Sequence, residues 1–257
     1  LNFFEKKPLF GKSIMVTRSR SQNSKLVERI MDLGGNPIEI PTIKIEKVQD
    51  NKELENEIKN LKDYTYLVLT SKNGVDIFFD KLDEMGLDCR ALANIKVCSI
   101  GAATSKAIIR RGIKPDIQPE KAVGESLYDE LKDIVSKEDK ILIPRAKNAR
   151  EFLVKKLNEI SNVTEVVTYE SVMDDSKKEE AINALEEGNL DYITFASSST
   201  VTNFINLIGE ENKDKLSNTK IISIGKITTK TILDNGLEVY KESEKASIES
   251  MIEAMSE

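Results

Sequence analysis

Six stretches of the chain contain no Asp or Glu, and five of them carry Lys or Arg, although the chain has 44 acidic against 38 basic residues. These stretches are 17–25, 70–75, 101–115, 144–150, 196–209 and 225–233. Several place hydroxyls or glycine where a helix is expected to begin. Such turns offer free backbone N–H groups at the positive end of the helix dipole, which suits an anion. Together the stretches predict the binding of a polyanion.

The candidate binding residues are basic side chains, hydroxyls, one amide and two glycines of these stretches. They are Arg18, Ser71, Lys72, Asn73, Gly101, Thr104, Arg145, Ser197, Ser198, Thr200, Gly225, Lys226 and Thr228. Any one hydroxyl taken alone is more simply an ordinary helix N-cap. The basic residues could equally be solvated charges on helix faces. Six acid-free stretches in one acidic chain nevertheless favour a binding role.

The residue inventory excludes several kinds of chemistry. Histidine is absent, and Cys89 and Cys98 are the only cysteines, so neither a His-based acid/base site nor a four-cysteine zinc site can form. No G-x-G-x-x-G or Walker pattern occurs, which argues against dinucleotides and nucleoside triphosphates. The net charge of −6 argues against nucleic acid. We therefore expect neither metal nor cofactor, and chemistry that depends on hydroxyls, Tyr, Lys, Arg, carboxylates or backbone amides.

Tyr169 is the candidate for acid chemistry. It lies in TEVVTYESVMDD (164–175), which alternates apolar and polar residues as a strand does, like PIEIPTIKIEKV (37–48). If these two segments form a two-stranded connector beside the binding turns, the phenol would reach them. A half-buried strand aromatic is an equally good interpretation.

The elements that position these residues occur in two copies. Residues 12–41 resemble 139–168, residues 63–82 resemble 190–209, and residues 96–117 resemble 220–240. The offset falls only from 127 (139 against 12) to 124 (220 against 96), which indicates a tandem duplication. Each copy alternates β-rich runs with stretches of helical period. The pattern predicts two doubly wound α/β domains, whose ligands bind at the carboxyl ends of the strands, in a cleft if the domains face each other.

The connector segments suggest a crossed domain arrangement. One domain would combine 1–38 with 173–257, the other would be 46–165, and 39–45 and 166–172 would connect them. Uncrossed halves are also compatible with the sequence. No apolar run approaches the roughly 20 residues of a membrane span, and LNFFEKKPLFGK does not predict a signal peptide. We expect a cytoplasmic protein.

The paired TSKNGV and FASSSTV turns, the IGxxT turns at 100–104 and 224–228, the V-T-R opening and Tyr169 resemble the uroporphyrinogen-III synthase family over essentially the whole chain. The resemblance implies two flavodoxin-like domains with a two-stranded β connector, a monomer without cofactor, and hydroxymethylbilane as substrate. It implies a cyclising hydro-lyase that makes uroporphyrinogen III, and it leaves open a transient contact with the upstream bilane-forming enzyme. The alternative is a non-catalytic cytosolic two-domain protein that binds a small polyanion.

The resemblance also suggests roles for single residues. It implies that Tyr169 is the acid that aids departure of the substrate hydroxyl. Thr104 and Thr228 match the family's IGxxT threonines, and Ser197 falls in its serine-bearing loop. Lys226 stands where many relatives carry Pro, which would add a contact to a substrate carboxylate.

Overall fold

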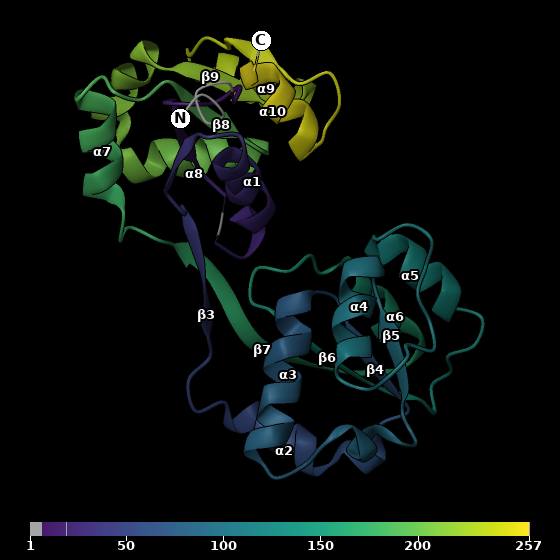
Figure 1. Ribbon diagram of the computed structural model, residues 1–257. Coiled ribbons are helices and arrows are strands. Elements are labelled where there is room, and N and C mark those ends of the chain that lie inside the picture. The colour runs from purple at the N-terminus through teal and green to yellow at the C-terminus, as the bar shows by residue number, and fades with distance from the viewer. Residues whose placement is uncertain (1–6, 19, 257) are drawn as a thin grey trace. The chain divides into compact units, whose positions relative to one another are not determined.

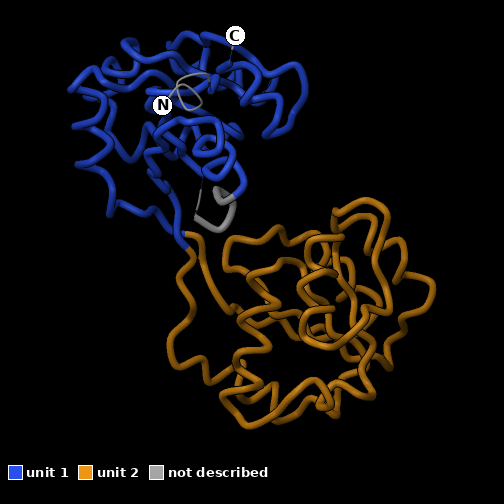
Figure 2. The backbone as a smooth tube through the Cα atoms, in the orientation of Figure 1, with its two compact units in different colours: residues 1–44, 172–257 blue, residues 45–171 orange. Residues whose placement is uncertain are grey.

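The computed structural model describes residues 7–18 and 20–256, and the chain folds into two compact units (Figure 2). Unit 1 combines Leu1–Lys44 with Val172–Glu257, and unit 2 is Ile45–Ser171. Unit 2 is thus continuous in the sequence, whereas unit 1 is assembled from segments on both sides of it.

Unit 1 is an α/β unit built on one five-stranded sheet (Figure 1). Its strands are β1 (Ser13–Val16), β2 (Asn36–Glu39), β8 (Tyr192–Phe195), β9 (Lys220–Ser223) and β10 (Lys241–Glu242). Its helices are α1 (Arg20–Asp32), α7 (Lys178–Glu186), α8 (Ser198–Ile208), α9 (Lys226–Asp234) and α10 (Ile248–Ser256), with a 3-10 segment η3 (Glu210–Asn218).

Unit 2 has the same kind of architecture. Its sheet contains β3 (Ile43–Lys47), β4 (Tyr66–Leu69), β5 (Lys96–Ser99), β6 (Lys140–Ala146) and β7 (Asn162–Met173). Its helices are α2 (Lys52–Lys59), α3 (Lys72–Glu84), α4 (Ala102–Arg110), α5 (Gly124–Leu131) and α6 (Phe152–Ile160), with 3-10 segments η1 (Leu61–Asp63) and η2 (Cys89–Leu92).

Four strands of each sheet share one order, as the duplication predicts. Unit 1 has the order β2-β1-β8-β9-β10, and its strand pairs are parallel. Unit 2 has β7-β6-β4-β5, also paired in parallel, with β3 added beside β7. The unit 1 order is the 2-1-3-4-5 order of doubly wound flavodoxin-like folds. The expected fold class, two parallel-sheet α/β domains, is confirmed.

Helices cover both faces of each sheet, which is why inner strands such as β4 and β8 are buried at every position. In unit 1, α7, α8 and α9 pack on one face around Phe195 and Phe204, and α1 and α10 pack on the other around Ile14. In unit 2, α2, α3 and α4 bury Phe78 on one face, while α5 and α6 bury Leu157 on the other. Each such side chain contributes roughly 1.5–3 kcal/mol through burial. These two-sided cores fix the carboxyl edge of each sheet.

Matching glycines end α4 and α9, the helices that follow β5 and β9. Gly112 follows α4 with a φ of 89°, and Gly236 follows α9 with a φ of 76°. This left-handed conformation favours glycine because a Cβ would crowd the backbone. The loops after both helices therefore turn back toward the sheet in the same way.

Within residues 7–18 and 20–256, no helix has both the length and the apolar character to cross a bilayer. In the same part of the chain, no group of three or more acidic or cysteine side chains is arranged to hold a metal ion.

Candidate active site

The carboxyl edge of unit 2 carries the turn between β4 and α3, in the sequence Thr70-Ser71-Lys72. Ser71 has extended backbone and caps α3, because its Oγ accepts a hydrogen bond from the Gly74 amide at 2.9 Å. A serine cap of this kind contributes about 1 kcal/mol to helix stability. The simpler interpretation of Ser71 as an N-cap is therefore confirmed, and a further role has to come from its other contact.

That other contact is with Tyr169. The Tyr169 hydroxyl lies 2.7 Å from Ser71 Oγ, and either oxygen can be the donor. Tyr169 is on β7, where its carbonyl accepts a hydrogen bond from the Lys147 amide at 2.8 Å. Only 6% of Tyr169 is exposed. Two hydroxyls that can exchange a proton are thus held at the N-terminus of α3, where the helix dipole favours negative charge.

The bulge between β6 and β7 helps to place the phenol. The β6–β7 register shifts between Arg145 and Ala146, so that Ala146 pairs with Tyr169. A bulge bends the strand and turns the side chains that follow it.

Arg145 makes its contacts with other residues of unit 2. Its guanidinium pairs with Glu165 at 2.9 Å and donates to the Ala149 carbonyl at 2.9 Å. Only 7% of the residue is exposed. Arg145 holds the loop after β6 in shape, and it would have to exchange partners to bind a ligand directly.

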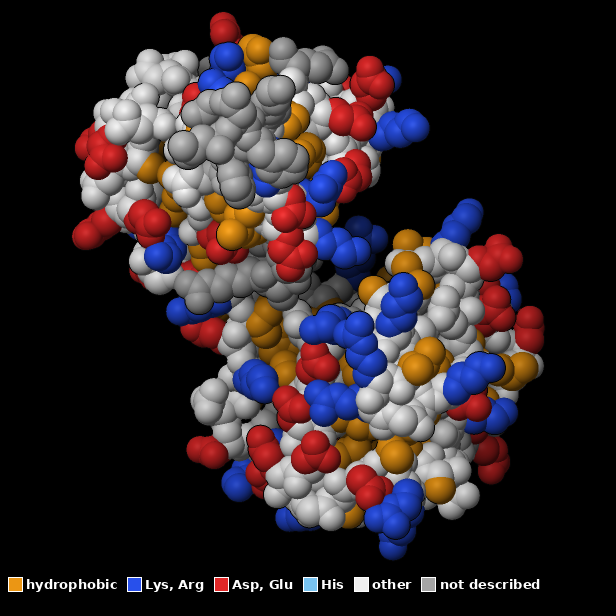
Figure 3. All heavy atoms as spheres, viewed as in Figure 1, with side chains coloured by type: hydrophobic (Ala, Val, Ile, Leu, Met, Phe, Trp, Pro, Cys, Tyr) orange, Lys and Arg blue, Asp and Glu red, His pale blue; other side chains and the backbone are white. Residues whose placement is uncertain are grey.

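The space-filling view shows Lys and Arg side chains over α3 and α4 of unit 2, with Asp and Glu among them (Figure 3). Lys72 pairs with Asp76 at 3.1 Å, and Arg111 pairs with the same carboxylate at 3.2 Å. Burial disfavours ionisation of Asp76, but the hydrogen bonds from Lys72 and Arg111 hold its pKa below the ordinary value. Asn73, the next residue of α3, is half-buried. The positive charge at the start of α3 is therefore partly neutralised by its own helix.

The second turn of unit 2 joins β5 to α4 through Gly101. Its φ of −177° is ordinary extended backbone, yet a Cβ there would lie 2.6 Å from the Ala122 Cβ. Glycine is required for lack of space. Thr104 is buried in the first turn of α4, and Ser105 beside it hydrogen-bonds both Ser99 and Gln118.

Unit 1 repeats the first turn with different hydrogen bonds. Ser197 caps α8 in a capping box: its Oγ accepts from the Thr200 amide at 3.2 Å, and Thr200 Oγ1 accepts from the Ser197 amide at 3.1 Å. Ser198 Oγ donates to the Ile227 carbonyl at 3.2 Å, which ties the start of α8 to the start of α9. Arg18 is half-buried directly after β1. Here too the N-cap interpretation is confirmed for Ser197.

The second turn of unit 1 leads from β9 into α9 and is open. Gly225 has a φ of 169°, and a Cβ there would meet nothing within 4 Å. Lys226 is exposed, Ile227 is 80% exposed, and Thr228 is buried. The Lys226 ammonium has no hydrogen bond or ion pair with another described residue. This turn therefore offers one unpaired cation to a ligand.

The sequence did not reveal a polar cluster that underlies both second turns. Thr229 Oγ1 hydrogen-bonds Ser223 at 2.9 Å and Glu242 at 2.6 Å. The same contacts link Ser105 to Ser99 and Gln118 in unit 2. The sequence did contain a signal for this cluster, because Ser105 and Gln118 are 13 residues apart, as are Thr229 and Glu242.

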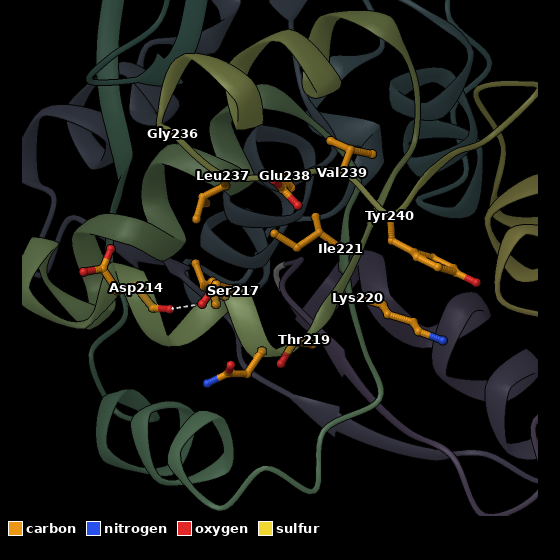
Figure 4. Close-up of a pocket in the computed structure, with 12 residues that line it drawn as sticks. Asp214, Ser217, Thr219, Lys220, Ile221, Gly236, Leu237, Glu238, Val239 and Tyr240 are labelled. Carbon is orange, nitrogen blue, oxygen red and sulfur yellow. Dashed lines mark hydrogen bonds between the residues drawn. The ribbon is translucent and has the colours of Figure 1, made fainter.

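A cavity of about 530 Å³ lies elsewhere, at the amino end of β9 in unit 1 (Figure 4). Lys220 and Tyr240 lie side by side there, with the ammonium 4.6 Å from the ring centre. This cation–π contact stabilises the Lys220 ammonium, so a ligand is not needed to explain a positive charge in the cavity. None of the hydroxyl turns lines this cavity, so its size alone does not make it the candidate site.

The fold and the turns define a class: a duplicated α/β protein with two parallel sheets, whose carboxyl edges carry hydroxyl-capped helix N-termini. The sequence profile described as "Uroporphyrinogen-III synthase HemD" matches residues 24–253. The chain belongs to this family.

Individual relatives agree with the family match. The chain is 34% identical to porphyrin biosynthesis protein HemD of Ruminiclostridium josui over 258 aligned positions, which cover all of this chain but half of that protein. It is 27% identical to the uroporphyrinogen-III synthase of Synechococcus elongatus, with 96% of each chain covered. A mutant uroporphyrinogen III synthase from Thermus thermophilus has a similar fold, with a TM-score of 0.61, 18% identity, and 94% of this chain and 96% of that chain covered.

Proposed function

We propose that this chain closes the linear tetrapyrrole hydroxymethylbilane to uroporphyrinogen III, with ring D inverted and water lost. Membership in the synthase family supports the proposal. The observation in the structure that carries it is the 2.7 Å hydrogen bond between Tyr169 and Ser71 at the N-terminus of α3. It holds a hydroxyl that can donate a proton at a helix N-terminus that would also attract the substrate carboxylates.

Tyr169 is the proposed acid for departure of the hydroxyl group. Its proton passes to the hydroxymethyl oxygen on ring A, the C–O bond breaks, and water leaves as the pyrrole nitrogen supplies electrons. The resulting phenolate accepts a hydrogen bond from Ser71 and faces the positive end of the α3 dipole. Because the pyrrole itself stabilises the cation, Tyr169 assists this step within the usual range of acid catalysis, roughly 10²–10⁴-fold, or below it.

The demanding step is geometric. Attack must occur at the substituted carbon of ring D, giving a spiro intermediate that fragments and recloses with loss of a proton. That proton restores the phenol, so the overall products are uroporphyrinogen III and one water. Holding the two ends of the linear tetrapyrrole close together can lower the barrier to ring closure by several kcal/mol. Fixed dipoles of the protein backbone can stabilise the cationic intermediates.

The substrate carries eight carboxylates, and the proposed binding groups are the hydroxyls, amides and cations of the turns. In unit 2 they are Ser71, Lys72, Asn73, Gly101, Thr104 and Arg145. In unit 1 they are Arg18, Ser197, Ser198, Thr200, Gly225, Lys226 and Thr228. Lys226 is supported by its lack of a described partner, while Lys72 and Arg145 would exchange Asp76 and Glu165 for substrate.

We also propose that the functional domains are 1–38 with 173–257 and 46–165, connected by 39–45 and 166–172. The adjacency of β3 and β7 supports this assignment. The proposed working form is a cytoplasmic monomer.

The test is to supply hydroxymethylbilane and separate the oxidised porphyrin isomers. We expect isomer III to form well above the rate of spontaneous closure, and Tyr169→Phe to form it more slowly. Isomer I alone, formed at the spontaneous rate, would contradict the proposal and favour the non-catalytic binding protein.

A further inference from the structure

A pocket of about 330 Å³ opens at the carboxyl edge of the unit 2 sheet. It is lined from three directions: by Thr70 after β4, by Ile100 after β5, and by Ala149 and Arg150 after β6. Strands β4 and β6 are neighbours from which the chain leaves in opposite directions, toward β5 and toward β7. Such a switch point is where doubly wound sheets bind their ligands.

The pocket walls are apolar and partly exposed. Val123 and Phe152 line it and are 40% and 37% exposed, respectively. The Phe152 ring packs edge-on against Tyr128, with centroids 6.3 Å apart, which fixes its orientation. Exposed apolar side chains around a concave surface are typical of a ligand site. The face of a flat aromatic ring would fit against Phe152.

Arg150 gives the pocket a positive rim. It is exposed, and its guanidinium has no hydrogen bond or ion pair with another residue in the described ranges. Arg145, five residues earlier, is fully used by Glu165 and backbone carbonyls. Arg150 is thus the free arginine of this loop, and its planar guanidinium suits a carboxylate. A negative charge beside the ring would complete the contacts.

From the pocket at the β4/β6 switch point we infer a subsite of unit 2 that binds one pyrrole ring, with the ring against Phe152 and a ring carboxylate on Arg150. The inference rests on the proposed function, because pyrroles that carry acetate and propionate are the units of that substrate. A volume of about 330 Å³ is at the small end of ligand pockets, roughly 300–1,000 Å³. It suits a single substituted ring rather than a whole tetrapyrrole.

Glu125 also lines the pocket, in the first turn of α5. Its carboxylate is stabilised by the helix dipole but repels a bound anion. The subsite therefore contains one residue for the ring, one that attracts the carboxylate and one that weakens its binding, and each can be changed separately.

The absence of tryptophan from the chain allows a direct test. Phe152→Trp introduces a single fluorophore into the pocket of the intact chain, and Phe10→Trp introduces one at an exposed site of unit 1 as a control. The probe is porphobilinogen, a single pyrrole with one acetate and one propionate. Succinate, a diacid without a ring, controls for simple anion binding.

We expect porphobilinogen to change the emission of Phe152→Trp saturably and to leave Phe10→Trp unchanged. In the Phe152→Trp background, Arg150→Gln should weaken binding about tenfold or more, the scale of a charge-assisted hydrogen bond. Glu125→Gln should strengthen it severalfold, and the exposed Arg110→Gln should leave it unchanged. In the protein without tryptophan, Arg150→Gln should raise KM for hydroxymethylbilane with little loss of kcat.

The proposal is overturned if Phe152→Trp shows no saturable change, if Phe10→Trp or succinate gives the same change, or if Arg150→Gln binds as tightly as its parent. An unchanged KM in Arg150→Gln would also overturn it. Because the isomer assay on the unmodified chain does not involve these variants, a failed subsite is distinguished from a failed synthase: isomer III still forms in the first case and not in the second.

Discussion

The two copies of the serine turn differ in what lies beside the serine. Ser71 in unit 2 and Ser197 in unit 1 both cap the helix that follows the third strand of the doubly wound order. Ser71 also contacts the Tyr169 hydroxyl, whereas Ser197 completes a capping box with Thr200. At the offset of 127 the counterpart of Tyr169 is Thr42, whose hydroxyl donates to the buried Thr17 carbonyl. The helix-capping function is thus shared, while the candidate proton donor belongs to one copy.

The second turns differ in access. A Cβ at Gly101 would meet Ala122, but one at Gly225 would meet nothing within 4 Å. Unit 2 covers its turn with the segment that leads into α5, and unit 1 leaves its turn open with Lys226 and Ile227 exposed. The duplication therefore preserved two helix N-termini and gave them different surroundings, one covered by a neighbouring segment and the other open.

Removing the phenol hydroxyl of Tyr169 is the strongest test of whether only one copy carries a proton donor. We expect Tyr169→Phe to lower kcat by about one to two orders of magnitude, at or below the lower end of the range for general acids. Thr42→Val, at the matching position of unit 1, should keep kcat within about twofold, since its hydroxyl only supports a backbone carbonyl. Steady-state kinetics with isomer analysis measures both. Equal rates for the two variants would remove the distinction between the copies.

Gly→Ala at the two second turns tests the difference in space. Gly101→Ala should lower the free energy of unfolding by about 1–3 kcal/mol, because the new methyl overlaps Ala122. Gly225→Ala should change it by less than about 0.5 kcal/mol, as at other open surface positions. Urea denaturation followed by circular dichroism provides the comparison. A large loss at Gly225 would show that its turn is not open.

Removing the two serine caps separates capping from chemistry. Ser71→Ala and Ser197→Ala should each cost about 1 kcal/mol of stability, the usual value for an N-cap. Only Ser71→Ala should also lower kcat, because it alone removes a serine hydroxyl that is hydrogen-bonded to Tyr169. Ser71→Thr keeps both hydrogen-bonding functions and should restore most of the rate. A matching loss of kcat in Ser197→Ala would mean that the phenol contact is not what distinguishes Ser71.

The smallest effect concerns acid stability. In unit 2, Lys72 and Arg111 hold the pKa of Asp76 below its ordinary value of 3.8, and the position in α8 that corresponds to Asp76 (76 + 126) is Thr202. A carboxylate with a lowered pKa contributes stability above its unfolded pKa and loses it as pH falls through the folded pKa. Asp76→Asn should therefore be less stable than the parent at pH 7, and the gap should close below about pH 4. A gap that persists at pH 2 would contradict this assignment.

Much of the fold could be predicted because the duplication doubles each weak signal. A single YLVLTSKNG could be many things, but its recurrence as YITFASSST with the same neighbours fixes a βα unit. Inner strands such as β4 and β8 are buried on both faces, so their apolar runs are nearly continuous and easy to recognise. The caps at Ser71 and Ser197 follow from local sequence alone.

The candidate site was harder to predict from the sequence, because the residues in contact there are distant along the chain. The hydrogen bond between Ser71 and Tyr169 spans 98 residues and depends on the bulge in β6–β7 register. Arg145 was expected in the site, but its partner Glu165 is on the neighbouring strand, and only the register reveals it. Lys72 could have been anticipated better, since Asp76 follows it at the i,i+4 spacing of helical ion pairs.

The insertion of unit 2 between β2 and β8 also sets the order in which the molecule can assemble on the ribosome. All strands of the unit 2 sheet have been translated by residue 173, whereas β1 and β2 have no neighbour beyond each other until β8 is made. Domains generally fold as units while the chain emerges. Strands β1 and β2 are therefore made before the unit 2 sheet but enclosed after it, because their apolar residues are covered only once residues 172–257 have been made.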